Sequence, residues 1–268
     1  MIAHTNTPFL LRFECSDTHG AVLFSTTRNG GVSRPPFDTF NLGNFSDDNT
    51  TDIAENRRRL SDALGIEPHR LFIPKQVHGD RIVTVDTDFL STSAAEQTAL
   101  IDGCDALITN VPGVCIGITT ADCVPVLLYD AQKRVAAAIH AGWRSTVRKI
   151  VTKTIEETRR QFGISAANLI AAIGPAIGQA AFEVGDEVVD AFREAGLLYP
   201  TVCTRCSETG KAHLNLPEIN RLQLTACGVK PENIELSGLC THTHGDLFFS
   251  ARRDGIRSGR MVTGIAIK

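Results

Sequence analysis

The sequence has no apolar segment long enough to cross a membrane. Its 268 residues are 43% hydrophobic, but the apolar stretch 114–129 is interrupted by two threonines, Asp122 and Pro125. A membrane-spanning helix needs about 18 consecutive apolar residues. Residues 1–13 also lack the basic start, apolar block and small-residue cleavage site of a secretory signal. We therefore expect a soluble, cytoplasmic protein with no membrane partner.

An excess of charge of one sign is also missing. The chain has 27 lysines and arginines against 30 aspartates and glutamates, a formal net charge of −3, and neither sign forms long runs. Nucleic-acid binding depends on concentrated positive charge, so we expect no nucleic-acid partner. Eight cysteines are too few for a disulfide scaffold in a chain of this length. We expect reduced thiols, available as metal ligands or nucleophiles.

The glycine motifs of nucleotide-binding folds are absent as well. No Gly-x-Gly-x-x-Gly lies between a predicted strand and a predicted helix, and no phosphate-loop sequence occurs anywhere. A doubly wound dinucleotide-binding fold is therefore not expected. No repeat, low-complexity tract or Pro/Gly/Ser linker divides the chain. We expect a single domain over residues 1–268.

Short runs rich in valine and isoleucine predict a fold with many strands. The predicted strands are 21–26, 71–77, 81–85, 114–119, 124–129, 135–139, 169–173 and 261–267. Amphipathic patterns, each followed by a glycine, predict helices at 52–64, 145–162, 186–195 and 217–227. Neighbouring strands interrupted by single helices favour mixed sheets flanked by helices, an α/β (α+β) fold, over a regular strand–helix alternation.

Three predicted strand ends lie next to side chains that bind metals. His78 follows strand 71–77, Cys123 precedes strand 124–129, and His140 follows strand 135–139. Two imidazoles and a thiolate suit zinc, and three protein ligands leave the fourth tetrahedral position open to water or substrate. The sequence spacings match no compact zinc finger, so the hypothesis requires convergence in the folded chain. The alternative is three unrelated side chains with ordinary hydrogen bonds.

A second group of cysteines and histidines has closer spacing. Cys203 and Cys206 form a Cys-x-x-Cys pair, and Cys240, His242 and His244 follow later in the chain. Such spacing is typical of metal-binding fingers. The pair nevertheless lies in a polar, loop-like stretch, and we favour incidental surface thiols.

Six longer segments form a recognisable set. They read QVHGDRIV, DALITNVPGVCIGITTADCVPVLLYD, AAIHAGWR, IGPAIG, FEVGDEV and FFSARRDG. Together they resemble the YfiH family, also described as laccase-domain or polyphenol-oxidase-like and as purine nucleoside phosphorylase-like. The similarity runs from about Phe24 to the carboxyl terminus. It implies an α-β-β-α layered fold.

The resemblance also implies a metal site and an activity. By position in the family motifs, His78, Cys123 and His140 would bind zinc and carry catalysis. The implied reactions are phosphorolysis of adenosine, inosine and methylthioadenosine to free base plus (methylthio)ribose 1-phosphate, and deamination of adenosine. The implied partners are thus purine nucleosides and phosphate.

Deamination suits such a zinc, because the ion lowers the pKa of a bound water toward about 7. The usual zinc-deaminase pattern, His-x-Glu with Pro-Cys-x-x-Cys, is absent from the sequence. Asp122 is a candidate for moving the proton. We favour the simpler interpretation, in which Asp122 orders the turn before Cys123.

Phosphorolysis requires positive charge or backbone amides around the phosphate. Arg144 lies at the start of the predicted helix 145–162, where backbone N–H groups and the helix dipole favour an anion. Resemblance to other family motifs adds Arg28, Asn41 and Arg252 as substrate or phosphate contacts. The alternatives are a solvated arginine at position 144 and a turn closed by Asn41.

Two other activities stay open. A copper-dependent polyphenol oxidase, or laccase, needs many clustered histidines, whereas the eight of this chain are scattered, so copper is less favoured than zinc. In a cysteine hydrolase acting on amide or peptidoglycan-like substrates, Cys123 would be a nucleophile activated by His140, with His78 orienting the base. A binding protein without activity also fits the sequence, which does not predict the oligomeric state.

Overall fold

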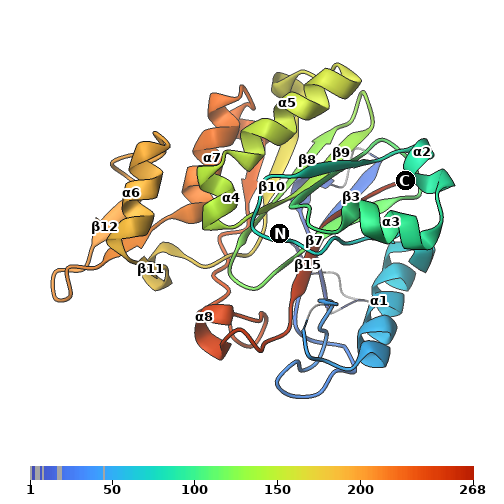
Figure 1. Ribbon diagram of the computed structural model, residues 1–268, viewed down its shortest axis with the longest axis horizontal. Coiled ribbons are helices and arrows are strands. Elements are labelled where there is room, and N and C mark those ends of the chain that lie inside the picture. The colour runs from blue at the N-terminus through green and yellow to red at the C-terminus, as the bar shows by residue number, and fades with distance from the viewer. Residues whose placement is uncertain (1, 4–6, 8, 17–19, 45) are drawn as a thin grey trace.

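The structure, a computed structural model, describes residues 2–3, 7, 9–16, 20–44 and 46–268. Two six-stranded mixed sheets lie at its centre (Figure 1). The first sheet has the order β1 (Ile2–Ala3), β2 (Leu10–Arg12), β3 (Ala21–Thr26), β15 (Met261–Ile267), β7 (Cys115–Thr120) and β4 (Leu71–Phe72). The second has the order β14 (Ile234–Leu236), β10 (Ile170–Ile173), β8 (Val124–Asp130), β9 (Val135–Ala141), β6 (Ala106–Thr109) and β5 (Ile82–Val85).

Helices cover the outer faces of both sheets. The helices are α1 (Thr50–Leu64), α2 (Thr87–Ser91), α3 (Ala94–Ile101), α4 (Trp143–Val147), α5 (Ile150–Phe162), α6 (Asp186–Glu194), α7 (Leu216–Ala226) and α8 (Ala251–Asp254). In Figure 1, α4, α5 and α7 lie together along the second sheet, which they contact. Helix α1 packs on the first sheet through Leu60, which joins the cluster containing Val22 and Val262.

A third, three-stranded sheet stands at one side of the molecule beside α6 (Figure 1). Its order is β11 (Glu183–Val184), β13 (Ala212–Leu214) and β12 (Cys203–Arg205), all antiparallel. The turn from β12 to β13 is closed by hydrogen bonds between Cys206 and both Gly210 and Lys211.

Alternation along the central strands sorts side chains into layers. On β9, Ala136 and Ala138 face the first sheet, whereas Ala137 and Ile139 face the helices of the second. Because successive side chains of a strand point to opposite faces, a strand buried on both faces is apolar throughout. Sheet packs on sheet, with helices outside, so the α-β-β-α fold expected from the sequence is confirmed.

Two predicted elements differ most from the observed ones, and strand 135–139 extends to Ala141, so that His140 lies within β9. The predicted helix 145–162 is two helices, α4 and α5, because Lys149 has a left-handed φ of 60° that interrupts the helical path. The predicted strand 71–77 ends at Phe72, and the chain then runs as a loop that carries His78. Across the part of the chain that the structure describes, no helix is sufficiently long and apolar to cross a membrane.

Candidate metal centre

Three side chains from distant parts of the sequence meet at one edge of the two central sheets. One ligand atom from each of His78, Cys123 and His140 can be chosen so that all three atoms lie within 4.8 Å of one another. The Cys123 Sγ lies 3.7 Å from His78 Nε2. Zinc bonds of about 2.0 Å to nitrogen and 2.3 Å to sulfur in a tetrahedron place the two atoms about 3.5 Å apart. The donor set and its spacing therefore fit a zinc ion.

The register of two strands and the small size of a glycine allow these three side chains to approach one another. In the antiparallel β8–β9 pair, His140 lies opposite Pro125, two residues after Cys123. A Cβ on Gly142 would lie 3.0 Å from His78 Cδ2 and 3.1 Å from Cys123 Sγ. Only glycine allows so close an approach at this position without displacing two ligands.

One buried carboxylate, Asp105, holds two of the three ligands. It accepts hydrogen bonds from the backbone N–H groups of Val77 at 3.2 Å, His78 at 2.9 Å and Gly79 at 2.7 Å. Its Oδ1 also lies 2.7 Å from His140 Nδ1. With Nδ1–H donating to the carboxylate, Nε2 is the nitrogen left to bind a metal, and the carboxylate raises the basicity of the ring.

Asp105 also stabilises an unusual backbone. His78 has a φ of 59°, in the left-handed region that few non-glycine residues adopt. Asp105 accepts hydrogen bonds from the amides of His78 and of both its chain neighbours, and these bonds hold His78 in the left-handed conformation. The sequence predicted no role for Asp105, although this residue opens the family-like segment that begins DALITN.

The electrostatics of the cluster favour a thiolate. Burial raises the pKa of the Cys123 thiol, but the charge and hydrogen bond of His140, followed by those of His78, outweigh burial and lower the pKa. Burial likewise lowers the pKa of His140, but Cys123 and Asp105 outweigh it and raise the pKa. A thiolate is the form of cysteine that binds metals and attacks electrophiles.

A cavity of about 510 Å³ opens beside the cluster. Its volume is in the range of small-molecule sites. It is lined by all three side chains of the cluster together with Gly43, Ser46, Gln76, Thr119, Thr120, Ala121, Asp122, Ile177, Phe182, Ala251, Arg252, Ile256 and Arg260.

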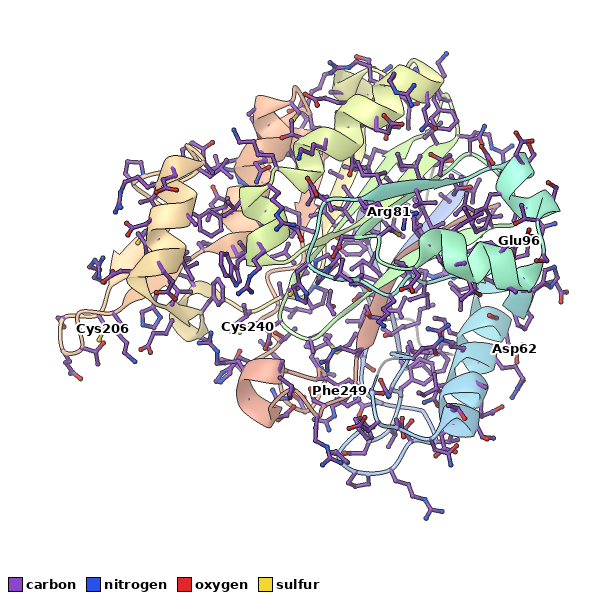
Figure 2. The ribbon with its side chains drawn as sticks, viewed as in Figure 1. Asp62, Arg81, Glu96, Cys206, Cys240 and Phe249 are labelled. Carbon is purple, nitrogen blue, oxygen red and sulfur yellow. The ribbon has the colours of Figure 1, made fainter. Side chains whose placement is uncertain are left out.

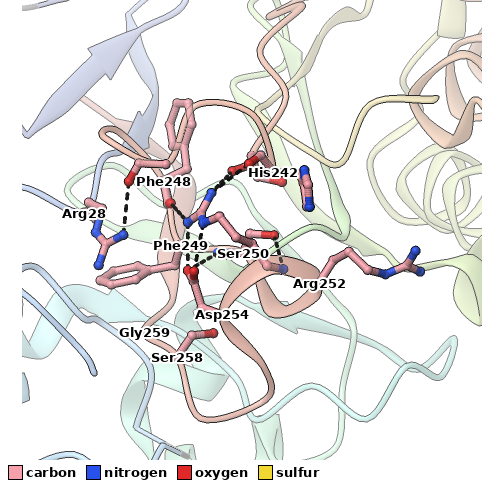
Figure 3. Close-up of polar contacts among 12 residues, drawn as sticks. Arg28, His242, Phe248, Phe249, Ser250, Arg252, Asp254, Ser258 and Gly259 are labelled. Atoms are coloured by element: carbon pink, nitrogen blue, oxygen red, sulfur yellow. Dashed lines mark hydrogen bonds and ion pairs between the residues drawn. The ribbon is translucent and has the colours of Figure 1, made fainter. Parts of the chain in front are cut away.

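Of the four predicted substrate contacts, only Arg252 lines this cavity. Its Nη1 donates to the carbonyl oxygens of Ala181 at 3.3 Å and Glu183 at 3.0 Å, and its guanidinium lies 5.7 Å from the centre of the Phe182 ring. Figure 3 shows the Arg252 side chain extending away from its neighbours Ser250 and Asp254.

Arg28 and Arg144 lie outside the cavity lining. The guanidinium of Arg28 bonds the carbonyl oxygen and carboxylate of Asp38 and the carbonyl of Gly245, and it stacks 4.7 Å from the ring centre of Phe249 (Figure 3). The guanidinium of Arg144 lies 4.1 Å from the ring centre of the adjacent Trp143.

Asn41 is fully buried and also does not line the cavity. Its Oδ1 accepts the backbone N–H of Gly43 at 3.0 Å and of Arg260 at 2.9 Å. Its Nδ2 donates to Ser46 Oγ at 2.8 Å and to Asp48 Oδ2 at 2.9 Å. Asn41 thus joins its own loop to the start of β15.

Asp122 is occupied by structural contacts. Its Oδ1 accepts the hydroxyl of Thr241 at 2.6 Å, and its Oδ2 accepts the backbone N–H of Arg252 at 2.7 Å. Its own carbonyl accepts the N–H of Ile177 at 2.9 Å. These contacts join the turn before Cys123 to the segments that carry Ile177, Thr241 and Arg252, which favours a structural role for Asp122.

The closely spaced second group of cysteines and histidines does not assemble. Among the described residues, no group of three metal-binding side chains other than His78, Cys123 and His140 occurs. Figure 2 shows Cys206 at the outer end of the β12–β13 hairpin, whereas Cys240 lies near the centre of the molecule. Cys240 Sγ instead accepts the N–H of Gly178 at 3.1 Å.

Comparison with known proteins places this chain among a set of close relatives. The family model described as multi-copper polyphenol oxidoreductase laccase matches residues 22–268. A protein of Bacteroides thetaiotaomicron named purine nucleoside phosphorylase is 42% identical over 268 residues, covering 100% of this chain and 99% of the relative. A protein of an unknown prokaryotic organism named adenosine deaminase RL5 is 42% identical over 246 residues, covering 92% and 94%.

Solved structures share the whole fold. The crystal structure of YlmD from Geobacillus stearothermophilus superposes with a TM-score of 0.90 at 35% identity, covering 100% of this chain and 99% of that one. A hypothetical protein YfiH of Bacillus licheniformis gives a TM-score of 0.90 at 34% identity, covering 99% and 98%.

Proposed function

This chain belongs to the multi-copper polyphenol oxidoreductase laccase family, the YfiH family, and we propose that it is a zinc-dependent purine nucleoside enzyme. The observation that carries the proposal is the convergence of His78, Cys123 and His140 beside a cavity large enough for a nucleoside. The names of two relatives that match more than nine-tenths of this chain, a purine nucleoside phosphorylase and an adenosine deaminase, support the substrate class. The core shared by the two sheets supports one catalytic domain.

Zinc suits the donor set better than copper does. Imidazole and thiolate are both common zinc ligands, and three protein ligands leave the fourth position open, whereas oxygen-reducing copper clusters need many histidines. When bound, the ion would supply Lewis acidity and a stronger nucleophile at neutral pH. Asp105 contributes by fixing the tautomer of His140 and the backbone of His78 before any ion arrives.

We propose two reactions in this cavity. In deamination of adenosine, a water oxygen bonds to C6, the C6–N6 bond breaks, and a proton from water leaves with the nitrogen as ammonia. In phosphorolysis of adenosine, inosine or methylthioadenosine, a phosphate oxygen bonds to C1′ as the C1′–N9 bond breaks. Arg252 on the cavity wall supplies positive charge for phosphate. Arg28, Asn41 and Arg144 contact other protein groups, which favours structural roles for them over direct contacts with substrate.

A cysteine hydrolase is the second candidate, and one observation favours it. Cys123, His140 and Asp105 form a chain in which the pKa of the thiol is lowered and the imidazole is oriented by a carboxylate. The same arrangement is typical of cysteine hydrolases, with Cys123 as the nucleophile, His140 as its base and Asp105 as the group that orients the base. Alkylation of Cys123 separates the two candidates, because a thiolate held by zinc reacts only after a chelator has removed the ion.

The proposed function is tested by incubating purified protein of known metal content with adenosine, inosine and methylthioadenosine, with and without phosphate. We expect about one zinc per chain and inosine from adenosine in either buffer. We expect free base and the ribose 1-phosphate only when phosphate is added. Stoichiometric zinc without turnover of any nucleoside would overturn the proposal.

A further inference from the structure

The cavity contains a second guanidinium, Arg260, which the sequence did not single out. Its Nη1 donates to the carbonyl oxygens of Ser258 at 2.7 Å and Gly259 at 2.9 Å and to the Ser258 hydroxyl at 3.0 Å. Its Nη2 donates to the carbonyl of Ile256 at 3.3 Å. All of these acceptors are uncharged.

The two cavity arginines have charged groups nearby but no close ion pair among the described residues. Within the described ranges, no carboxylate forms an ion pair with Arg260 or with Arg252. Burial lowers the pKa of Arg260, although the charges of Cys123 and Asp122 partly offset that effect. An arginine stays protonated even so. A desolvated charge without an ion-pair partner is costly, and an anion entering the cavity would remove that cost.

The stem of Arg260 is held in one position. Asn41 Oδ1 accepts the N–H of Arg260 and that of Gly43. A Cβ on Gly43 would lie 2.8 Å from Arg260 Cγ, so the glycine leaves room for the stem. Four carbonyl and hydroxyl contacts then fix the guanidinium itself. A cation that is already held in position binds an anion without losing further side-chain entropy.

A buried hydroxyl belongs to another residue of the same cavity lining. Thr120 lines the same cavity, is only 2% exposed, and its Oγ1 has no hydrogen-bond partner among the described residues. In the antiparallel β7–β15 pair, Thr120 lies opposite Met261, the residue directly after Arg260. A buried hydroxyl without a partner is destabilising, and an anionic oxygen that accepts from it would satisfy it.

We propose that Arg260, together with Arg252 and the Thr120 hydroxyl, forms an oxyanion subsite that binds the phosphate consumed in phosphorolysis. This inference rests on the proposed function. The bound hydrogen phosphate gives one oxygen to C1′, and the purine leaves with the electron pair of the C1′–N9 bond. The phosphate proton goes to the departing purine, so the products are the free base and the ribose 1-phosphate dianion. Asn41 acts as a positioning residue for Arg260.

The test compares two reactions of one protein, because deamination consumes no phosphate. In Arg260→Gln we expect the KM for phosphate in inosine phosphorolysis to rise at least about tenfold, since a charge-assisted contact is lost. We expect kcat/KM for adenosine deamination in phosphate-free buffer to fall by a smaller factor than phosphorolysis, because deamination consumes no phosphate. Arg257→Gln is the matched control, because Arg257 is 73% exposed and outside the cavity lining, and both reactions should be unchanged.

A second variant, Thr120→Val, keeps the test valid if Arg260→Gln does not fold. Thr120→Val conserves side-chain shape and removes the unpartnered hydroxyl, so it should raise the KM for phosphate about threefold or more with no loss of thermal stability. An unchanged KM for phosphate in both variants would overturn the inference. Equal loss of phosphorolysis and deamination in Thr120→Val would do so as well.

Calorimetric titration with inorganic phosphate separates this inference from the proposed function. If wild type turns over no nucleoside, the proposed function fails, yet the subsite is still tested by binding. Phosphate binding to wild type and to Arg257→Gln, lost in Arg260→Gln, would support the subsite. No heat of binding to wild type at millimolar phosphate would overturn it.

Discussion

Two sets of cysteines and histidines can be compared in this molecule. In one, residues that are close in sequence lie apart in the structure, and in the other, residues that are distant in sequence lie together. The set with close spacing, Cys203 and Cys206 with the later Cys240, is spread from the tip of the β12–β13 hairpin to the centre of the molecule (Figure 2). The set with distant members, His78, Cys123 and His140, has its ligand atoms within 4.8 Å. Short spacing therefore does not by itself make a metal site.

The difference lies in what surrounds each set. Cys123 and His140 are placed by the register of two buried central strands, whereas Cys206 is held by a hairpin turn. Asp105 orients His140 and accepts the backbone N–H of His78, whereas no described carboxylate is hydrogen-bonded to Cys203 or Cys206. Convergent strand ends and an orienting carboxylate are the features that distinguish the candidate centre.

The largest effect is expected from removing the thiolate of the candidate centre. Cys123→Ala should lower kcat/KM for adenosine and inosine by at least about a thousandfold, because a ligand and the charge that holds the ion are both lost. Cys206→Ala, the matched change in the hairpin, should leave both values unchanged. Steady-state kinetics on the three proteins measure this difference. Turnover of Cys123→Ala near the wild-type rate would contradict the proposed role.

The next effect concerns Asp105, the carboxylate that orients the ligands of the candidate centre. Asp105→Asn keeps the shape of the side chain but removes its charge, so the metal affinity should fall about 10- to 100-fold. Competition with a chromophoric chelator measures the affinity. Asp186→Asn is the control, since Asp186 is 74% exposed and pairs with Arg205 beside the hairpin. Equal affinity in the Asp105→Asn and Asp186→Asn proteins would show that orientation by Asp105 is not needed.

Metal removal should change stability only when the candidate centre is intact. A ligand at about 100 times its dissociation constant stabilises the folded state by about 2.7 kcal/mol. For a chain of this size we therefore expect a chelator to lower the Tm of wild type by several degrees. The same treatment should leave the Tm of Cys123→Ala unchanged. Equal shifts in the two proteins, measured by scanning calorimetry, would place the stabilising ion elsewhere.

The smallest effect is expected in the hairpin. The double variant Cys203→Ser, Cys206→Ser changes two partly exposed side chains, and no described residue completes a metal site with them. We expect the free energy of unfolding to change by less than about 0.5 kcal/mol. Urea denaturation measures it. A loss of several kcal/mol that zinc restores would reveal a second metal site and reverse the comparison.

The sequence predicted the parts of the fold that depend on local patterns. Strands 21–26 and 261–267 were predicted with their observed bounds, because both are buried at every position and their short apolar, β-branched runs are visible in the local sequence. The break between α4 and α5 at Lys149 was missed, since the left-handed conformation of a lysine has no local signal. The small sheet was missed because its strands are two or three residues long.

The candidate site was predictable only in part. The side chains of the metal cluster stood out as metal-binding types at strand ends, and the family resemblance named them. Asp105 and Arg260 did not, because their roles come from contacts between residues far apart in sequence, such as Arg260 with Asn41. Arg28 was expected at the pocket from a motif, but its guanidinium bonds Asp38 and Gly245 instead.

Metal content tests the central claim most directly. Purified wild type, Cys123→Ser and the hairpin double variant would be analysed by mass spectrometry for zinc and copper per chain. The convergence of His78, Cys123 and His140 predicts about one zinc in wild type and in the hairpin variant, and almost none in Cys123→Ser. Full zinc occupancy in Cys123→Ser would contradict a centre built on that thiolate.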